Sequence, residues 1–273
     1  MPDLPQTSHI RLELRGPVLH LWLDRPELRN ALSAQMVREI VAAVAAIAGD
    51  RSVRIVVLRG AGGTFCAGGD IKTMSAVGEA PPLGAADELK DNNRRFGAML
   101  EAVNAAPQVV IAAVEGFAMG GGFGLACVAD ITIATADARF AMSDVMVGVV
   151  AAAISPFVVQ RIGLTAARRL AVTGLRLNGR EAAAIGIAHL AVQDAAALDT
   201  AVHEACNQVL ACGPAAIAAT KRLMLRAAGP TPIAELLDDA ADAFASAVRS
   251  TEGREGTRAF VEKRKPSWVV QVE

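Results

Sequence analysis

Two short apolar runs, each followed by a glycine-rich loop, constrain the fold most strongly. The runs are VRIVVLRG (53–60) and VVIAAVEG (109–116), and the loops after them contain GAGGTFCAGGD and FAMGGGFG. Continuous apolar runs of this length are typical of strands buried on both faces. In open α/β folds, ligands lie beyond the carboxyl ends of such strands. The sequence therefore predicts an α/β core with a ligand site between two glycine loops.

The remaining patterns extend this core and add a helical end. Alternating runs on either side of Gly16-Pro17 predict a hairpin, and Ser33 is suited to cap a helix. ADITIAT and ARFAM predict two more strands, and after about residue 155 the pattern turns helical. Helices are predicted over 198–212, 214–228, 232–249 and 253–264. We therefore expect a core over residues 1–197 and a helical region over 198–273 that packs on the core or on another subunit.

Composition excludes several classes of function. The 27 Lys and Arg nearly balance the 28 Asp and Glu, and no basic block suits nucleic acid. No uninterrupted apolar run reaches the roughly 20 residues of a membrane span. The first residues lack a leader-like apolar stretch, so a cytoplasmic protein is expected. Neither CxxC nor HExxH occurs, so no metal site is predicted and the four cysteines are expected to be reduced.

The glycine loops do not fit nucleotide-binding patterns. GxGxxG fails in both loops, and neither a Gly-Lys-Ser/Thr run nor a GxSxG elbow is present. The two loops taken together are more specific. Each places a backbone with little or no side chain at a strand end, at Gly68-Gly69 in one loop and at Gly120–Gly122 in the other. The amides of Gly69 and Gly121 are able to converge on one oxygen as an oxyanion hole. A helix that starts at Gly121 would further favour an anion there.

At this point the chain resembles the enoyl-CoA hydratase/isomerase (crotonase) superfamily. FCAGGDIKTM (65–74) and VEGFAMGGGFGLACVADITIA (114–134) are similar to its two signature segments. DRPELRNALS (24–33), TGLRLNGREAAAIGIAHLAV (173–192) and FVEKRKPSW (260–268) are similar to its other segments, in the expected order. The resemblance implies a spiral of ββα units with a helical C-terminal region and assembly as trimers or hexamers. It also implies an acyl-CoA thioester as substrate, with no cofactor beyond the coenzyme A that the substrate carries.

The resemblance also assigns residues. Gly69 and Gly121 match its oxyanion-hole positions. The positions matched to backbone and side chains around coenzyme A are Arg29, Ala31, Ala67, Gly68, Asp70, Ile71 and Lys72. In a trimer, the basic segment that begins at Lys263 is expected to reach the coenzyme A phosphate of a neighbouring subunit.

One acid of the family pattern is missing. Hydratases with two acids carry a glutamate where this chain has Gly124, and a second where it has Asp144. The resemblance therefore implies Asp144 as the single proton carrier, with space freed at Gly124 for substrate bulk or a second water. ISPFVVQRIG (154–163), together with Gly124, resembles the bacterial branch acting on 3-methylglutaconyl-CoA or isohexenylglutaconyl-CoA. FCAGGDIK favours the latter.

Three functions remain open on this sequence. The first is a lyase that adds water across the C2=C3 bond of a branched glutaconyl-CoA. The second is a Δ3,Δ2-isomerase of the same superfamily, which also needs one acid near position 144. The third is a binder of coenzyme A thioesters without catalysis, which the presence of Asp144 disfavours.

Overall fold

The computed structural model describes residues 2–70, 81–82 and 84–272, so the expected substrate contacts of Ile71 and Lys72 lie outside the described residues. Its main sheet has six strands in the order β1-β2-β3-β4-β6-β9. The strands are β1 (Ile10–Arg15), β2 (Val18–Leu23), β3 (Ile55–Gly60), β4 (Val109–Val114), β6 (Ile131–Thr135) and β9 (Leu190–Val192). β1 and β2 form the predicted antiparallel hairpin, and every later neighbour pairs in parallel.

The chain passes back and forth between the main sheet and a second sheet of three strands, and this path forms a spiral. The strands of the second sheet are β5 (Phe117–Met119), β7 (Arg139–Ala141) and β8 (Leu177–Asn178). After β4 the chain adds β5 and then α4 (Gly121–Val128), and after β6 it adds β7 and later α5 (Ser155–Thr173). This repetition of strand, strand and helix confirms the predicted spiral of ββα units.

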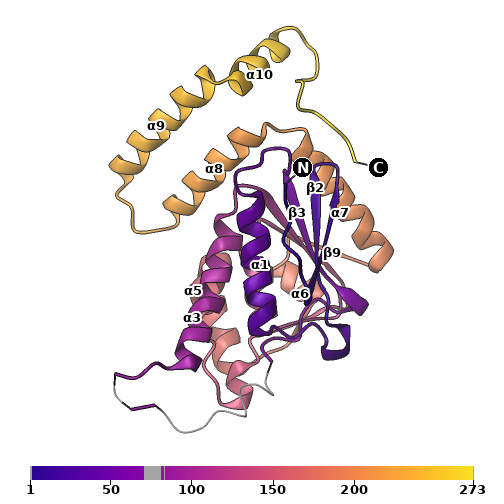
Figure 1. Ribbon diagram of the computed structural model, residues 1–273, viewed down its shortest axis with the longest axis vertical. Coiled ribbons are helices and arrows are strands. Elements are labelled where there is room, and N and C mark those ends of the chain that lie inside the picture. Colours follow the sequence, from indigo (N-terminus) through magenta and orange to yellow (C-terminus); the bar gives the residue numbers. More distant parts are fainter. Residues whose placement is uncertain (1, 71–80, 83, 273) are drawn as a thin grey trace.

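Alternation along the strands decides what each face of the main sheet contacts. Leu58 and Ala112 belong to one apolar cluster, whereas Val57 and Ile111 belong to another. The first cluster includes residues of α1 (Ala34–Ile47), α3 (Glu88–Ala105) and α4. That second cluster is completed by α7 (Ala195–Leu210), which covers the opposite face (Figure 1). Both faces are therefore buried, which explains why β3 and β4 read as continuous apolar runs.

The remaining elements connect and extend this core. α1 (Ala34–Ile47) begins as predicted at Ser33, whose hydroxyl accepts a hydrogen bond from the Met36 amide at 3.1 Å. The other elements are η1 (Pro26–Leu28), η2 (Ala61–Gly63), α3 (Glu88–Ala105), η3 (Asp144–Val147), α6 (Gly179–Ala184), α8 (Pro214–Ala227), α9 (Ile233–Arg249) and α10 (Thr251–Val261).

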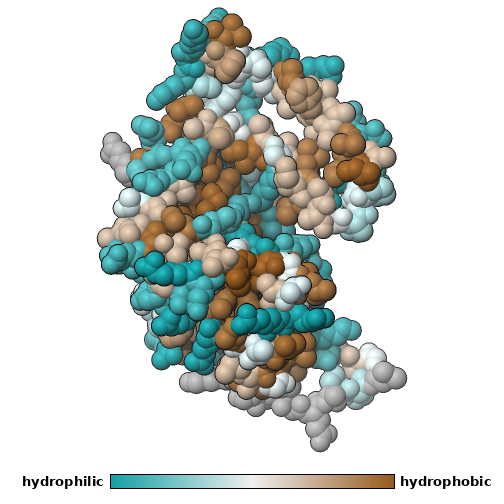
Figure 2. All heavy atoms as spheres, turned by 180° about the vertical axis from the view of Figure 1, so that it is seen from behind, coloured by the Kyte–Doolittle hydropathy of each residue, from teal (hydrophilic) through white to brown (hydrophobic). Residues whose placement is uncertain are grey.

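The last three helices form an arm that extends away from the core (Figure 1). Of the residues in α8, α9 and α10, all of which the structure describes, Ala259 alone is buried. Large apolar side chains lie open along the arm, including Leu237, Phe244 and Phe260, and Figure 2 shows apolar atoms gathered there. The expected boundary at residue 197 falls within α7, which packs on the sheet, so the arm proper begins at α8.

Candidate active site

Segment 66–70 is held between two neighbours by isolated bridges, and Gly68 within it has φ +104°. On one side, the Leu32 amide donates to the Gly68 carbonyl at 2.8 Å, and the Asp70 amide donates to the Leu32 carbonyl at 3.2 Å. In this parallel bridge the amide of the middle residue, Gly69, faces away from Leu32. On the other side, the Cys66 amide donates to the Phe117 carbonyl at 2.7 Å. The Gly69 amide therefore points to the side on which β5 lies.

The second glycine loop begins where β5 ends. Gly120 has φ +47° and its amide donates to the Ala141 carbonyl at 2.9 Å, so that α4 starts at Gly121. As the first residue of a helix, Gly121 has an amide without an intrahelical acceptor. A Cβ on Gly68 would lie 3.1 Å from the Met119 carbonyl oxygen, so the two loops touch. We call segments 66–70 and 118–121 together the glycine cradle.

Two amides of the glycine cradle are available to a ligand. Among the described residues, neither the Gly69 amide nor the Gly121 amide has a hydrogen-bond acceptor. Gly69 and Gly121 are partly exposed, whereas Gly68 and Gly120 beside them are buried. A Cβ at Gly121 would be 2.8 Å from Leu32 Cδ1 and 3.1 Å from Phe96 Cζ, so these two side chains approach the bare backbone closely. This arrangement can bind an oxyanion through backbone donors.

Asp144 brings an acid to the same place. It is the first residue of η3, after β7, and its Oδ2 lies 3.4 Å from the position that a Cβ on Gly120 would occupy. Its Oδ2 is buried and has no hydrogen-bond partner among the described residues. Burial raises the pKa of the Asp144 carboxyl above its ordinary value, against the opposing effect of its own backbone amide. A carboxyl in this setting is suited to both accept and donate a proton.

The turn before α1 brings further predicted residues to the glycine cradle. The Ala67 amide donates to the Arg29 carbonyl at 2.9 Å, which places Arg29 and Ala67 side by side. Arg25 joins the two segments, because its guanidinium donates to the Ala31 carbonyl at 2.8 Å and lies 3.4 Å from the Asp70 carboxylate. The structure therefore gathers Arg29, Ala31, Ala67, Gly68 and Asp70 in one region.

Gly124 differs from what the sequence suggested. It is buried one turn along α4, and a Cβ there would be 2.3 Å from Ile154 Cγ2 and 3.6 Å from Leu100 Cδ1. The expectation of free space for substrate bulk or a second water at Gly124 is therefore wrong. The space is filled because Ile154, the residue before α5, inserts its side chain against the bare backbone.

Lys263 lies apart from the glycine cradle within one chain. It is exposed and follows α10, in the part of the arm that Figure 1 places at the opposite end of the molecule from α3 and α5. Its neighbour Arg264 pairs with Glu255 at 2.7 Å in the same segment. A role for Lys263 at a substrate phosphate therefore requires a second subunit.

Sequence reasoning missed the apolar walls of the site. Leu32 and Phe96 stand over Gly121, and Leu100 and Ile154 over Gly124. Phe96 and Leu100 are four residues apart on α3, which is the spacing of one helix face. That periodicity identifies the buried face of α3, but the sequence holds no signal that the face meets the glycines of α4.

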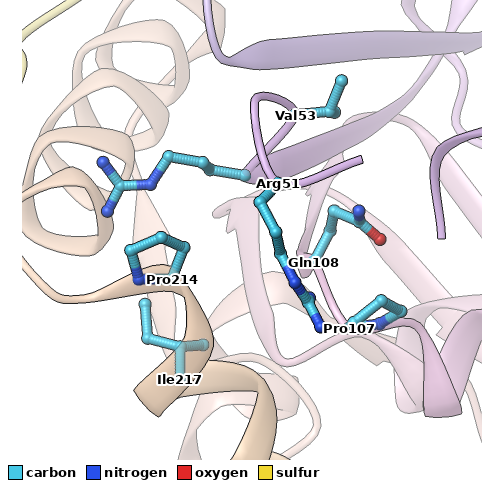
Figure 3. A pocket seen from close by; sticks show the side chains of 7 residues that line it. Arg51, Val53, Pro107, Gln108, Pro214 and Ile217 are labelled. Carbon is cyan, nitrogen blue, oxygen red and sulfur yellow. The ribbon is translucent and has the colours of Figure 1, made fainter. Parts of the chain in front are cut away.

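A hollow at the other end of the sheet is separate from this site. It lies before β3 and β4, at their amino ends, whereas the glycine loops follow their carboxyl ends. Figure 3 shows the side chains that line it, which come from Arg51, Val53, Arg54, Pro107, Gln108, Pro214 and Ile217. The described residues contain no group of His, Cys, Asp and Glu able to hold a metal ion. Among the described helices, none is long and apolar enough to cross a membrane.

Known proteins are similar to this chain in both sequence and fold. A sequence model of the family "Enoyl-CoA hydratase/isomerase" matches residues 13–271. The chain is 33% identical to a carnitinyl-CoA dehydratase of Proteus mirabilis, with 96% of this chain and 98% of that protein covered.

Two solved structures are more similar still. The structure of Pseudomonas aeruginosa AtuE is 50% identical with a TM-score of 0.91, covering 96% of this chain and 100% of that one. An enoyl-CoA hydratase/isomerase from Marinobacter aquaeolei is 48% identical with a TM-score of 0.89, covering 96% and 99%. The chain belongs to the enoyl-CoA hydratase/isomerase family, and its fold is the crotonase fold.

Proposed function

We propose that this enzyme adds water across the C2=C3 double bond of a branched glutaconyl-CoA, with isohexenylglutaconyl-CoA or 3-methylglutaconyl-CoA as substrate. Membership of a family of hydratases and isomerases supports the reaction class. The observation that carries the proposal is that Asp144 Oδ2 is buried beside Gly120 and that, within the described part of the chain, neither this oxygen nor the amide of Gly121 has a hydrogen-bond partner. The branched glutaconyl group rests on the motif resemblance of Gly124 and residues 154–163.

The amides of Gly69 and Gly121 hold the thioester oxygen. As Asp144 takes a proton from water, the resulting hydroxide bonds to C3 of the substrate. The electron pair of the double bond then moves towards the thioester, whose oxygen becomes an enolate oxyanion. Backbone donors fixed in advance favour this charge more than the neutral carbonyl, which is the source of rate enhancement.

Asp144 then returns its proton to C2, which collapses the enolate and restores the carbonyl. One carboxyl thus serves as base and as acid, and the two protons of water end on the C3 hydroxyl and on C2. Burial helps the first step, because a raised pKa makes the Asp144 carboxylate a stronger base towards water.

The segments beside the glycine cradle are proposed to bind coenzyme A. Arg29, Ala31, Ala67, Gly68 and Asp70 line the edge that leads from the cradle, and Ile71 and Lys72 follow in sequence. The ion pair between Arg25 and Asp70 joins the two segments that form this edge. The exposed apolar arm supports assembly into a homotrimer or hexamer, in which Lys263 would serve a neighbouring subunit. A stable monomer in light scattering would contradict that assembly.

A Δ3,Δ2-isomerase is the second candidate, because moving a proton between two carbons of one enolate also needs one acid and one oxyanion hole. A panel of four thioesters distinguishes the reactions: crotonyl-, 3-methylglutaconyl-, isohexenylglutaconyl- and a 3-enoyl-CoA. We expect loss of the enoyl absorbance and incorporation of ¹⁸O from labelled water with a branched glutaconyl-CoA. Conversion of the 3-enoyl-CoA without ¹⁸O incorporation, as the fastest reaction, would replace the hydratase with the isomerase.

A further inference from the structure

The segment that carries Asp144 is seated on α4 at two points. We call residues 144–154, between β7 and α5, the acid loop. At its start the Asp144 carboxyl lies against Gly120, and at its end the Ile154 side chain lies against Gly124. Gly120 and Gly124 are one helical turn apart, and the Gly124 amide donates to the Gly120 carbonyl at 3.1 Å. The two contacts therefore lie on one face of one helix.

The contact at Gly124 is the tighter of the two. Ile154 is 2% exposed and belongs to the main apolar cluster. Its Cγ2 lies 2.3 Å and its Cβ 2.9 Å from the position of a Cβ on Gly124, distances that real Cβ atoms do not tolerate. Any side chain at 124 must displace Ile154, and any loss of Ile154 atoms leaves a gap at Gly124.

Between its ends the acid loop has weaker attachments. The side chains of Val147 and Val150 are 60% and 76% exposed. The Val149 amide donates to the carbonyl of Asp144 at 3.0 Å, which is a bond within the loop itself. Two further packing contacts place Met146 against Gly174, where α5 ends, and the small side chain of Ala151, 6% exposed, in the main apolar cluster. Ile154 is the largest side chain by which the acid loop joins that cluster, so the position of Asp144 over the glycine cradle depends on it.

We propose that Ile154 is a positioning residue for the reaction: its insertion against Gly124 holds the acid loop on α4 so that the Asp144 carboxyl stays over the glycine cradle. The inference rests on the proposed function, in which Asp144 moves the proton. It also gives Gly124 a role that differs from opening space, because the missing side chain at 124 is the socket for Ile154.

The test uses three variants of the full chain. Ile154→Ala empties the socket, and Gly124→Ala fills it, so each should move the acid loop and lower kcat. A displacement on the order of 1 Å can cost up to about 10²-fold, so we expect losses of roughly 10–10²-fold. The double variant Gly124→Ala/Ile154→Ala removes the Cγ2 that would lie 2.3 Å from the new methyl group and leaves the two Cβ atoms 2.9 Å apart, so a smaller shift of the loop is needed than in Gly124→Ala alone. Its kcat should therefore lie above that of the worse single variant.

The controls separate positioning from general stability. Val158→Ala removes a fully buried side chain from the next turn of α5, and we expect lowered stability with kcat retained. The dissociation constant of a saturated acyl-CoA should stay within a few-fold in every variant, because the glycine cradle is unchanged. If Ile154→Ala fails to fold, Ile154→Leu, which keeps a side chain of the same size but lacks the Cγ2 methyl that lies against Gly124, should give a smaller loss of kcat in the same direction.

An activity-free measurement keeps this inference distinct from the proposed function. Hydrogen exchange should accelerate at the amides of Met146 and Val149 in Ile154→Ala, and stay as in the parent in Val158→Ala. Unchanged exchange together with unchanged kcat in Ile154→Ala would overturn the positioning role, as would a double variant no better than the worse single one. If Asp144→Asn retains kcat, the proposed function fails, while the exchange rates still decide whether Ile154 holds the acid loop.

Discussion

The glycine cradle and the acid loop meet at Gly120, yet they are built in opposite ways. The cradle is bonded through its backbone on both sides, to Leu32 and to Phe117, and its residues Gly68 and Gly120 are buried. The acid loop is fixed at Asp144 and, through the buried Ala151 and Ile154, near its far end, whereas Val145, Val147 and Val150 are 41% to 76% exposed. The oxyanion donors of the cradle are thus backbone amides in a constrained segment. The proton carrier, Asp144, is a side chain on a less constrained segment. Substitutions in the cradle should therefore harm chemistry and folding together, whereas those in the exposed part of the loop should leave folding nearly unchanged.

Among changes to the cradle, the largest effect should come from removing one of its backbone donors. Gly121→Pro deletes the amide hydrogen at the first position of α4, where proline is otherwise compatible with a helix. We expect kcat to fall by at least about 10²–10³. Gly121→Ala is the matched control, because it keeps the amide and adds a Cβ that meets Leu32 and Phe96. Steady-state rates for both variants decide the matter. Equal activity of the two would mean that crowding, and not the lost donor, explains the effect.

A smaller effect is expected where the two regions touch. Gly120→Ala places a methyl group 3.4 Å from Asp144 Oδ2 at a residue with φ +47°. The backbone strain should cost about 1–3 kcal/mol of stability, and the pressure on the carboxyl should lower kcat by roughly 10-fold. Thermal melting and kcat are measured on the same preparation. A normal kcat in a destabilised protein would place Asp144 outside the reaction path.

Cys66 gives a more modest test of the cradle itself. Burial raises the pKa of its thiol to about 12, so the group is neutral, and its sulfur accepts from the Gly68 amide at 3.4 Å. Cys66→Ala leaves that buried amide without a partner, which should loosen the residue beside Gly69 and lower kcat several-fold. Cys127→Ala removes an equally apolar buried thiol from α4 and is the control. The carbonyl stretch of a bound thioester, read by infrared difference spectroscopy, should shift in the first variant alone. A shift of the same size in both would assign the effect to core packing.

The smallest effect concerns stability and pH. Because burial raises the pKa of Asp144, the folded protein holds this proton more tightly than the unfolded chain does. Stability from this group is therefore lost as pH rises from the ordinary carboxyl pKa through the raised one. Asp144→Asn carries no such charge, so its melting temperature should exceed that of the parent at pH 7 and approach it at pH 4. A variant less stable than the parent at pH 7 would show that the carboxylate is satisfied in a way that the structure does not contain.

The sequence predicted the main architecture because its signals are local. The apolar runs at 53–60 and 109–116 became β3 and β4, and the helix after Ser33 and the helix at Gly121 formed where predicted. The short strands β5, β8 and β9 were missed, since two or three residues carry too little pattern. The spiral that joins them was implied by family resemblance and not by periodicity.

Within the site, the sequence identified the groups but not their neighbours. Gly69, Gly121 and Asp144 were named from the glycine runs and from resemblance, and the structure brings Asp144 to Gly120, the residue before Gly121. Their catalytic roles remain predictions. The meeting of Gly124 with Ile154 joins residues 30 positions apart through tertiary packing, which no local pattern encodes. For that reason the absence of a side chain at 124 suggested free space, whereas the fold fills it.

The most direct test of the account is Asp144→Asn, measured for turnover and for binding in the same protein. The account predicts a fall in kcat of roughly 10²–10⁴ on the best thioester of the panel, because the one proton carrier is lost. It also predicts that a saturated acyl-CoA binds with nearly unchanged affinity by calorimetry, because the glycine cradle is intact. A kcat within a few-fold of the parent would contradict the single-acid mechanism and require another group, or the substrate itself, to carry the proton.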